Sequence, residues 1–134
     1  MTAQEAHDLL GPLLGSELGT GDWVVLSDDR IARFNAAASH SGEEVPTMML
    51  VSLLPGLTST IKLPIDPPKT YVNYGLDASR LVRPVRPGER VRARAALLAI
   101  DDGGPWLQLK RRVVLENEAG QPVLEVDTLT RLYW

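Results

Sequence analysis

The sequence predicts an α+β protein in which a curved antiparallel sheet wraps around one buried helix. Four segments have the alternation of long strands and are separated by turn-forming links that contain glycine: residues 70–83, 90–101, 106–117 and 123–134. Residues 45–61 carry no charge and place apolar side chains on most sides of a helix, a pattern typical of a buried helix. Long strands of this kind need one face covered. We expect this central helix to be the only segment apolar enough to cover it.

The amino-terminal part of the chain predicts two more helices and a short strand. Apolar residues at helical spacing predict a first helix over residues 4–14. Residues 23–26 are a short apolar strand, and Ser27 is the N-cap of the next helix, followed by two acidic residues that favour its positive end. In the central helix, which starts near Pro46, Pro55 removes one backbone hydrogen bond and predicts a bend or a restart.

Composition indicates one small, soluble globular domain that spans residues 1–134. Hydrophobic residues make up 44% of the chain and charged residues 23%, close to the globular average. Cysteine is absent from the sequence, which excludes a disulfide framework, a Cys-ligated zinc site and a cysteine nucleophile. We therefore expect a single domain that depends on its hydrophobic core.

Charge and hydropathy exclude several classes of partner. The formal net charge is −3, which argues against nucleic-acid binding. The uncharged stretch 45–61 contains two prolines and is shorter than the membrane-spanning helix of about 20 residues, so we expect no membrane span. Residues 1–8 are polar and acidic, unlike a secretory signal, so we expect a cytoplasmic location.

A local basic row interrupts this acidic balance. Arg90, Arg92 and Arg94 lie at period two and share one face of a strand. We interpret them as a solvated strand face. The alternative is a landing site for an acidic cofactor tail such as the phosphates of coenzyme A.

Three blocks of residues carry a family resemblance. They are residues 15–34, which include Gly19-Thr20-Gly21-Asp22-Trp23, residues 51–57 in the central helix, and residues 73–88, which begin Asn73-Tyr74-Gly75-Leu76-Asp77. In this order they resemble the MaoC-like dehydratases, in the branch that includes NodN-like proteins. The resemblance implies a hot-dog fold, acyl-thioester or related unsaturated carbonyl substrates, and a homodimer with active sites between the central helix and the neighbouring subunit's strands. Edge-to-edge pairing of two sheets also removes their free edges.

The same resemblance implies that the active-site segment is missing. In the family, a helix ends in an Ala-Thr-Gly-Asp-like run and a His follows a few residues later; this Asp and His form the hydratase dyad. Here the helix ends Ala38-Ser39-His40, so His40 falls where the Asp is expected, and residues 41–46 lead straight into the central helix. Roughly 15 family residues are absent, more than an ordinary short loop. The resemblance therefore supports the scaffold and argues against the standard chemistry.

His40 is the first candidate catalytic residue. A histidine near a helix carboxyl end stabilises the helix when it is protonated, which is its structural interpretation. The catalytic interpretation makes His40 a general base that is oriented by Glu43 or Glu44.

The strand after the central helix offers further site residues. The Asn73 amide or the Tyr74 hydroxyl could hold a thioester carbonyl through a hydrogen bond. Their structural alternative is to satisfy buried backbone groups near a dimer seam. We expect Met49 on the central helix, and Asp77 and Arg80 on this strand, to contact the substrate.

No motif predicts a metal or a cofactor. The two histidines, His7 and His40, do not belong to a compact ligand motif, so we expect no metal site. The sequence has neither a Gly-x-Ser-x-Gly elbow nor a glycine-rich phosphate loop between a strand and a helix. We expect no cofactor and no NAD or ATP chemistry.

Three functions remain, and the choice among them rests on the family analogy. The first is a MaoC-like enzyme with a non-standard site, which hydrates, dehydrates or cyclises an enoyl, acyl-thioester or polyketide-like substrate. The second is an inactive acyl-thioester-binding protein, or a partner subunit of an active MaoC-like homologue. The third is a hot-dog thioesterase that uses Glu43 or Glu44. Asn73, Tyr74 and the open region around His40 are available to build a polar site. We therefore favour an enzyme slightly over a binding protein.

Overall fold

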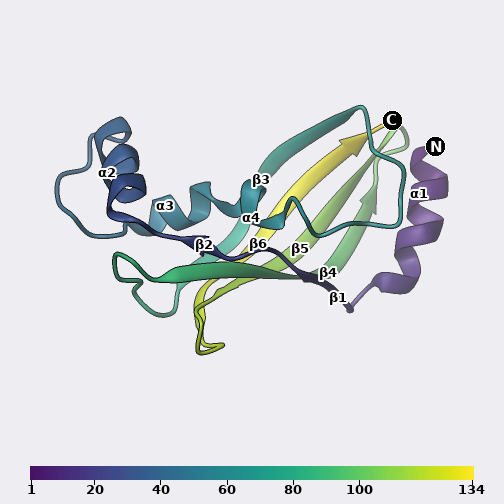
Figure 1. The fold of residues 1–134 in the computed structure, drawn as a ribbon. Coiled ribbons are helices and arrows are strands. Elements are labelled where there is room, and N and C mark those ends of the chain that lie inside the picture. The colour runs from purple at the N-terminus through teal and green to yellow at the C-terminus, as the bar shows by residue number, and fades with distance from the viewer.

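The computed structural model describes residues 1–134 and consists of one antiparallel sheet with helices along its inner face and at its ends (Figure 1). The helices are α1 (Ala3–Leu10), a 3₁₀ turn (Gly11–Leu13), α2 (Asp28–Ala37), α3 (Thr47–Ser52) and α4 (Leu54–Thr58). The strands are β1 (Glu17–Thr20), β2 (Val24–Val25), β3 (Thr70–Leu81), β4 (Arg90–Asp102), β5 (Trp106–Glu116) and β6 (Pro122–Tyr133). The four long strands expected from the sequence are confirmed, with ends that differ by at most two residues.

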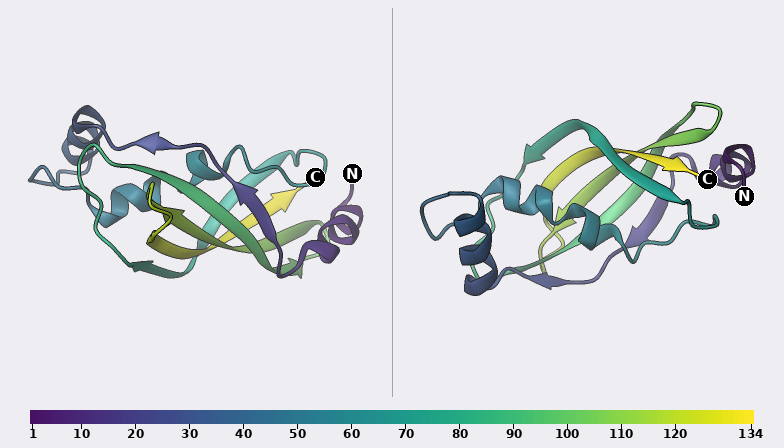
Figure 2. Two further views of the ribbon diagram at one scale, coloured as in Figure 1. Left: turned by 60° about the horizontal axis from the view of Figure 1, so that its bottom comes forward. Right: turned by 90° about the horizontal axis from the view of Figure 1, so that it is seen from above.

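The strand order in the sheet is β1-β4-β5-β6-β3, and the short β2 pairs with β4. Strands β4, β5 and β6 form the expected antiparallel meander, whereas β3 pairs with the far side of β6 and ends the sheet. The register of β3 shifts between Asn73 and Gly75 and again between Leu76 and Ala78. Bulges of this kind increase the local twist. The sheet curves around the central helices (Figure 2).

The central helix is divided into two helices, as the position of Pro55 in the sequence predicted. Helix α3 ends at Ser52 and α4 begins at Leu54, with Pro55 in its first turn. A proline is tolerated there because the first backbone N–H groups of a helix have no partner within it. The Leu57 N–H donates to the carbonyl oxygen of Leu53 at 2.9 Å, so helical hydrogen bonding resumes directly after Pro55.

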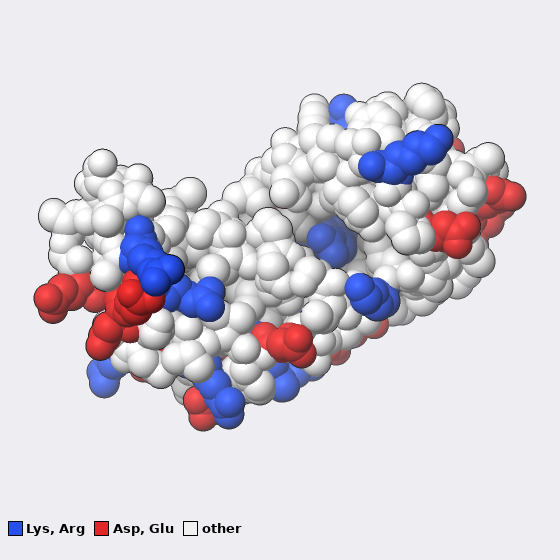
Figure 3. Space-filling model, turned by 45° about the horizontal axis from the view of Figure 1, so that its top comes forward, with Lys and Arg blue, Asp and Glu red and all other residues white.

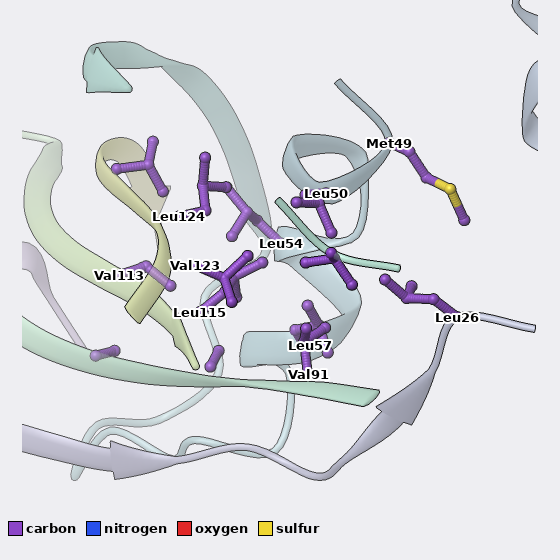
Figure 4. Close-up of a cluster of buried hydrophobic side chains, with 14 of the residues drawn as sticks. Leu26, Met49, Leu50, Leu54, Leu57, Val91, Val113, Leu115, Val123 and Leu124 are labelled. Atoms are coloured by element: carbon purple, nitrogen blue, oxygen red, sulfur yellow. The ribbon is translucent and has the colours of Figure 1, made fainter. Parts of the chain in front are cut away.

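The main hydrophobic core lies between α3, α4 and the inner face of the sheet (Figure 4). Its fully buried members come from both layers and include Met49, Leu50, Val91, Val113, Leu115 and Leu124. The sheet wrapped around a buried helix is therefore confirmed.

The N-cap of α2 is also as expected, since the Ser27 hydroxyl accepts a hydrogen bond from the Arg30 N–H at 3.2 Å.

A second apolar cluster corrects one expectation, because the central helix is not the only cover of the sheet. Helix α1 places Ala3, Ala6 and Leu10 against apolar residues at the other end of the same face. Those residues are Leu97, Leu107, Leu109 and Leu132. The first helix is also shorter than the expected 4–14, since it ends at Leu10 and a 3₁₀ turn that contains Pro12 follows.

Both chain ends lie at the end of the sheet that α1 covers, while α2 lies at the opposite end (Figures 1 and 2). No helix in the structure is both long enough and apolar enough to cross a membrane.

Gly21 marks the point at which the amino-terminal segment crosses the central helix. A Cβ atom at residue 21 would overlap the carbonyl oxygen of Leu57 in α4. The Gly21 N–H also donates to the Ala93 carbonyl oxygen of β4 at 2.8 Å, so the residue is held between the helix and the sheet. Its φ is not positive, and the close approach alone therefore requires glycine.

We predict that Gly21→Ala lowers the free energy of unfolding by about 1–3 kcal/mol, the usual range for an overpacked site. The control is Gly11→Ala, because Gly11 has helical φ and ψ and open space around it. This control should leave stability unchanged or slightly higher. Urea unfolding followed by tryptophan fluorescence measures both variants, and equal midpoints for the two would refute the close packing at Gly21.

Candidate functional site

Two adjoining cavities lie between the central helices and the strands β3, β5 and β6. Their volumes are about 220 and 500 Å³. Both are lined by five residues in common, which are Pro55, Thr58, Asn73, Arg111 and Thr130. The space-filling view shows a hollow on this face with a basic side chain inside it (Figure 3). The larger volume is within the range of small-molecule sites.

The two cavities differ in character. The smaller cavity is walled by Val51 and Leu54 of the helices, and by Leu76, Val113 and Leu129 of the sheet. The larger cavity runs toward the connection that follows α4, where Ile61, Lys62, Leu63, Ile65 and Pro67 line it together with Tyr71 of β3. The shared polar residues therefore lie where a small apolar slot meets a larger and more polar chamber.

Arg111 is the central polar residue of this site. The inner face of β5 presents Leu107, Leu109, Arg111, Val113 and Leu115 in succession, because side chains alternate along a strand. The four apolar members of this row are fully buried, and they divide between the two hydrophobic clusters. Arg111 thus occupies the interval between the cluster under α3 and α4 and the cluster under α1.

The Arg111 guanidinium has no partner in the structure. Its Nε atom is buried and makes no hydrogen bond, and no carboxylate lies within ion-pair distance of the side chain. Burial lowers the pKa of Arg111 from its ordinary value, with the nearby Tyr71 acting in the opposite direction. A guanidinium nevertheless stays protonated at neutral pH. The site therefore contains an uncompensated positive charge.

The neighbours of Arg111 are small polar groups. Thr130 of β6 is only 6% exposed and lines both cavities. Thr58 donates its hydroxyl proton to the Leu54 carbonyl oxygen at 2.8 Å, which leaves its oxygen lone pairs available. Asn73 stands beside the first bulge of β3, and bulges often redirect side chains at functional sites.

The loop residues proposed as catalysts lie elsewhere. His40, Glu43 and Glu44 are all exposed, in the connection 38–46 between α2 and α3, and none of them lines either cavity. No hydrogen bond or ion pair joins His40 to either glutamate. Figure 1 shows this connection at the far end of the molecule, beyond the sheet. The isolated chain does not bring these three side chains to the cavity.

The buried amide of Asn35 shapes this connection. Its Nδ2 donates to the carbonyl oxygens of Gly42 and Glu44 at 3.1 and 3.3 Å. The His40 N–H donates to the Asn35 carbonyl oxygen at 2.8 Å, just after the helix. The short loop therefore has a defined conformation.

Of the other expected site residues, only Asn73 reaches the cavities. Tyr74 is 53% exposed and lies under the Arg131 guanidinium, 3.6 Å from the ring centre. Met49 is buried in the main core. Asp77 forms an ion pair with Lys110 at 2.6 Å and Arg80 forms one with Glu125 at 2.9 Å, away from both cavities.

The arginine row of β4 is occupied by intramolecular contacts. The guanidinium groups of Arg90 and Arg92 stack on Trp23, with their carbons 5.0 and 4.6 Å from the ring centre. Arg92 and Arg94 both bond to the buried carboxylate of Glu116, at 2.6 and 3.3 Å. These pairings satisfy the row internally, which argues against its use for coenzyme A phosphates.

Sequence reasoning missed Arg111, Thr58 and Thr130. The signal for Arg111 was present, because it is the one charged residue in the alternating apolar row of β5. Thr58 and Thr130 had no such signal, since they become part of a cavity only through the packing of α4 over β6.

Comparisons with known proteins agree with this architecture. No protein-family model matches the sequence. The chain is 29% identical over 140 aligned positions to 3-hydroxyacyl-thioester dehydratase Z of Mycobacterium tuberculosis, and the match covers 91% of this chain and 92% of the relative. Among solved structures, a monoamine oxidase regulatory protein from Archaeoglobus has a TM-score of 0.76, 14% identity and 90% coverage of both chains. The MaoC-like dehydratase of Rhodospirillum rubrum has a TM-score of 0.73 and 17% identity, over 93% of this chain and 96% of that one.

Two further structures share the fold at lower similarity. The ChsH1-ChsH2 complex of Mycobacterium tuberculosis has a TM-score of 0.63 and 13% identity, over 97% of this chain and 96% of the matched one. A thioesterase superfamily member from Thermus thermophilus has a TM-score of 0.64 and 21% identity, over 90% and 83%. The fold is therefore the hot-dog fold.

Within that fold, the sequence match is to a dehydratase, and one of the structural neighbours is a MaoC-like dehydratase. The chain is similar to this dehydratase in sequence and to MaoC-like proteins in fold, which agrees with the resemblance drawn from residues 15–88.

We predict that Glu116→Gln lowers the free energy of unfolding at neutral pH and makes it depend less on pH in the acid range. Burial alone raises the pKa of Glu116, but hydrogen bonds from Arg92 and Arg94 outweigh it and hold the pKa below its ordinary value of 4.5. A carboxylate with a depressed pKa stabilises the fold above pH 4.5, and this contribution is lost as the pH falls through the folded-state pKa.

The matched control for this prediction is Glu118→Gln, because Glu118 and its partner Arg90 are both well exposed. Exposed pairs contribute little to stability. Urea unfolding between pH 3 and pH 7 makes the comparison, and parallel profiles for the two variants would count against a stabilising role of Glu116.

Proposed function

We propose that this protein binds an acyl thioester, or a related unsaturated carbonyl compound, in the cavities beneath α4. In this proposal it acts as the substrate-binding subunit of a MaoC-like assembly, and a second hot-dog subunit supplies the acid and base of a hydration or dehydration. The substrate class follows the dehydratase to which the chain is similar.

The observation that carries this proposal is the chemistry of the cavity walls. Neither cavity is lined by a His, Asp or Glu, and the only ionisable groups there are Lys62, Tyr71 and Arg111. The resemblance implies an Asp and a His as the hydratase dyad, and proton transfer requires such groups within hydrogen-bond reach of the substrate. Binding without a complete set of catalysts is what these walls support.

The length of the match with the dehydratase supports the loss of the standard segment. The alignment has 140 positions, but 91% of this chain is about 122 residues. About 18 positions of the relative therefore have no counterpart here. The connection between α2 and α3, which consists of residues 38–46 alone, is where the resemblance places the missing residues.

The free edge of β3 supports an assembly. This strand ends the sheet, and it is exposed along nearly all of its length. Its large apolar side chains Tyr71, Val72, Tyr74, Leu76 and Leu81 are 38% to 61% exposed. A long apolar edge without protection pairs readily with another strand. The partner is either a second copy or a different MaoC-like chain, and the fold neighbours include the ChsH1-ChsH2 complex.

A second candidate function keeps catalysis in this chain. The ordered loop that Asn35 holds would present His40, with Glu43 or Glu44, to a substrate bound by a neighbouring subunit. The same loop would have to supply the water-activating glutamate of a thioesterase. Because these side chains lie outside the cavities of their own subunit, both reactions depend on the assembly.

We predict that the purified protein binds crotonyl-CoA and a bulkier enoyl-CoA but hydrates neither. Isothermal titration calorimetry measures binding, and loss of the enoyl absorbance measures turnover. His40→Ala should bind both compounds as the native chain does, because His40 does not line the cavities. Turnover by the native protein that disappears in His40→Ala would instead establish the second candidate.

We predict that the purified protein is a dimer and that Val72→Lys shifts it toward monomer in sedimentation velocity. A lysine on a free strand edge opposes pairing, and Val72 is an exposed apolar residue of β3. The control is Leu9→Lys, which changes an exposed leucine of α1, a helix that contacts β4 and β5. A monomeric native protein would contradict the pairing of two copies along β3 and leave a different MaoC-like chain as the partner. Equal weakening by both variants would contradict an interface along β3.

A further inference from the structure

We propose that Arg111 holds a carboxylate carried by the acyl group of the ligand, so that the cavities select an acidic substrate over a neutral one. This inference rests on the proposed function and specifies its substrate class. Dehydratase-type chemistry does not itself require a carboxylate remote from the thioester. The reason to expect one is found in the walls of the cavities.

The first argument is the state of the Arg111 side chain. A buried charge is costly unless it is paired and hydrogen-bonded. In this chain every other arginine of β4 and β5 bonds to a carboxylate: Arg90, Arg92 and Arg94 to glutamates and Arg112 to Asp127. Arg111 alone faces inward, and it bonds to none. A half-buried charge without a partner is costly to keep in the empty protein, which indicates a group retained for binding.

The second argument is the sign of the charge around it. The two cavities are lined by two charged residues, Arg111 and Lys62, and both are positive. The chain as a whole has a formal net charge of −3, so this local excess of positive charge runs against its composition. With no acidic side chain to neutralise it, the site attracts an anion.

The third argument is the geometry of the surrounding groups. A guanidinium binds a carboxylate through two parallel hydrogen bonds. Asn73 and Thr130 line the same space as Arg111, and they provide an amide and a hydroxyl for further hydrogen bonds. The smaller cavity continues from this point as an apolar slot that suits a carbon chain.

A thioester carbonyl alone would leave the charge of Arg111 uncompensated, because a carbonyl oxygen carries only a partial charge. A full negative charge is needed, and a carboxylate on the acyl chain supplies one within the cavity. A phosphate group has the same fork-compatible oxygens, so inorganic phosphate is the comparison ligand in the experiment below.

The experiment compares ligands that differ by one group. The probes are the N-acetylcysteamine thioester of crotonic acid, the corresponding monothioester of fumaric acid, and monomethyl fumarate, with inorganic phosphate as the fourth. The two thioesters share the thioester and the double bond, and differ in a terminal methyl or carboxylate. Isothermal titration calorimetry with the native protein at low salt gives the four dissociation constants.

We expect the fumaryl thioester to bind about tenfold to 100-fold more tightly than the crotonyl thioester, the usual gain from a charge-assisted hydrogen bond. Arg111→Met should abolish this preference, and Arg111→Lys should retain part of it. The matched control is Arg112→Met, which removes the neighbouring arginine on the opposite face, where it pairs with Asp127. This control should keep the full preference.

A readout without ligand complements the binding data. Arg111→Met should raise the midpoint of thermal unfolding by a few degrees, because it replaces an unpaired charge with an apolar group of similar length. Arg112→Met should lower it, because it leaves the largely buried Asp127 without its partner. A lower unfolding midpoint or a smaller dimer fraction in Arg111→Met would show that Arg111 pairs with a carboxylate of a second subunit. That result would overturn the inference.

The outcomes also separate this inference from the proposed function. Equal binding of the two thioesters would leave thioester binding intact and overturn the role of Arg111. Arg111-dependent binding of monomethyl fumarate and the fumaryl thioester with equal affinity would support the carboxylate site and contradict thioester recognition. Tighter binding of inorganic phosphate than of monomethyl fumarate would overturn the assignment to a carboxylate.

Discussion

The sheet is longer than the central helix that it wraps, and the rest of the structure depends on this mismatch. The eleven residues of β5 extend over about 36 Å, whereas residues 47–58 of α3 and α4 span about 18 Å. Helix α1 covers the far end of the strands through Ala6 and Leu10. The two covers do not meet, and the cavities open between them, with α4 as one wall.

The proposed function depends on the residues that line this interval. The positions of β5 on either side of the interval are apolar and buried, because they pack under the helices. The interval is therefore the only stretch of the inner row of β5 in which a polar side chain faces a cavity. Arg111 occupies it without a carboxylate, and the bulged edge strand β3 brings Asn73 beside it. The same edge strand leaves an apolar border that a second subunit can cover. The proposed ligand site and the proposed interface therefore both lie near β3.

The sequence predicted the framework well, because the framework depends on local periodicity. Alternation located the four long strands, Pro55 located the break between α3 and α4, and the three blocks of residues identified the fold. The lining of the cavities was predicted less well, because cavities arise from contacts between residues far apart in the chain. His40, Glu43 and Glu44 were grouped by their closeness in sequence, yet they lie on an exposed loop. The cover provided by α1 was missed because its apolar stripe gives no information on which surface it meets.

The central claim is that Arg111 binds a carboxylate of the ligand. A crystal structure of the protein soaked with the fumaryl thioester tests it most directly. The account predicts that the two carboxylate oxygens lie about 2.7–2.9 Å from the Arg111 nitrogens, with the acyl chain along the slot beside Val113. An Arg111 guanidinium bonded to a carboxylate of a neighbouring subunit, with the ligand elsewhere, would contradict it.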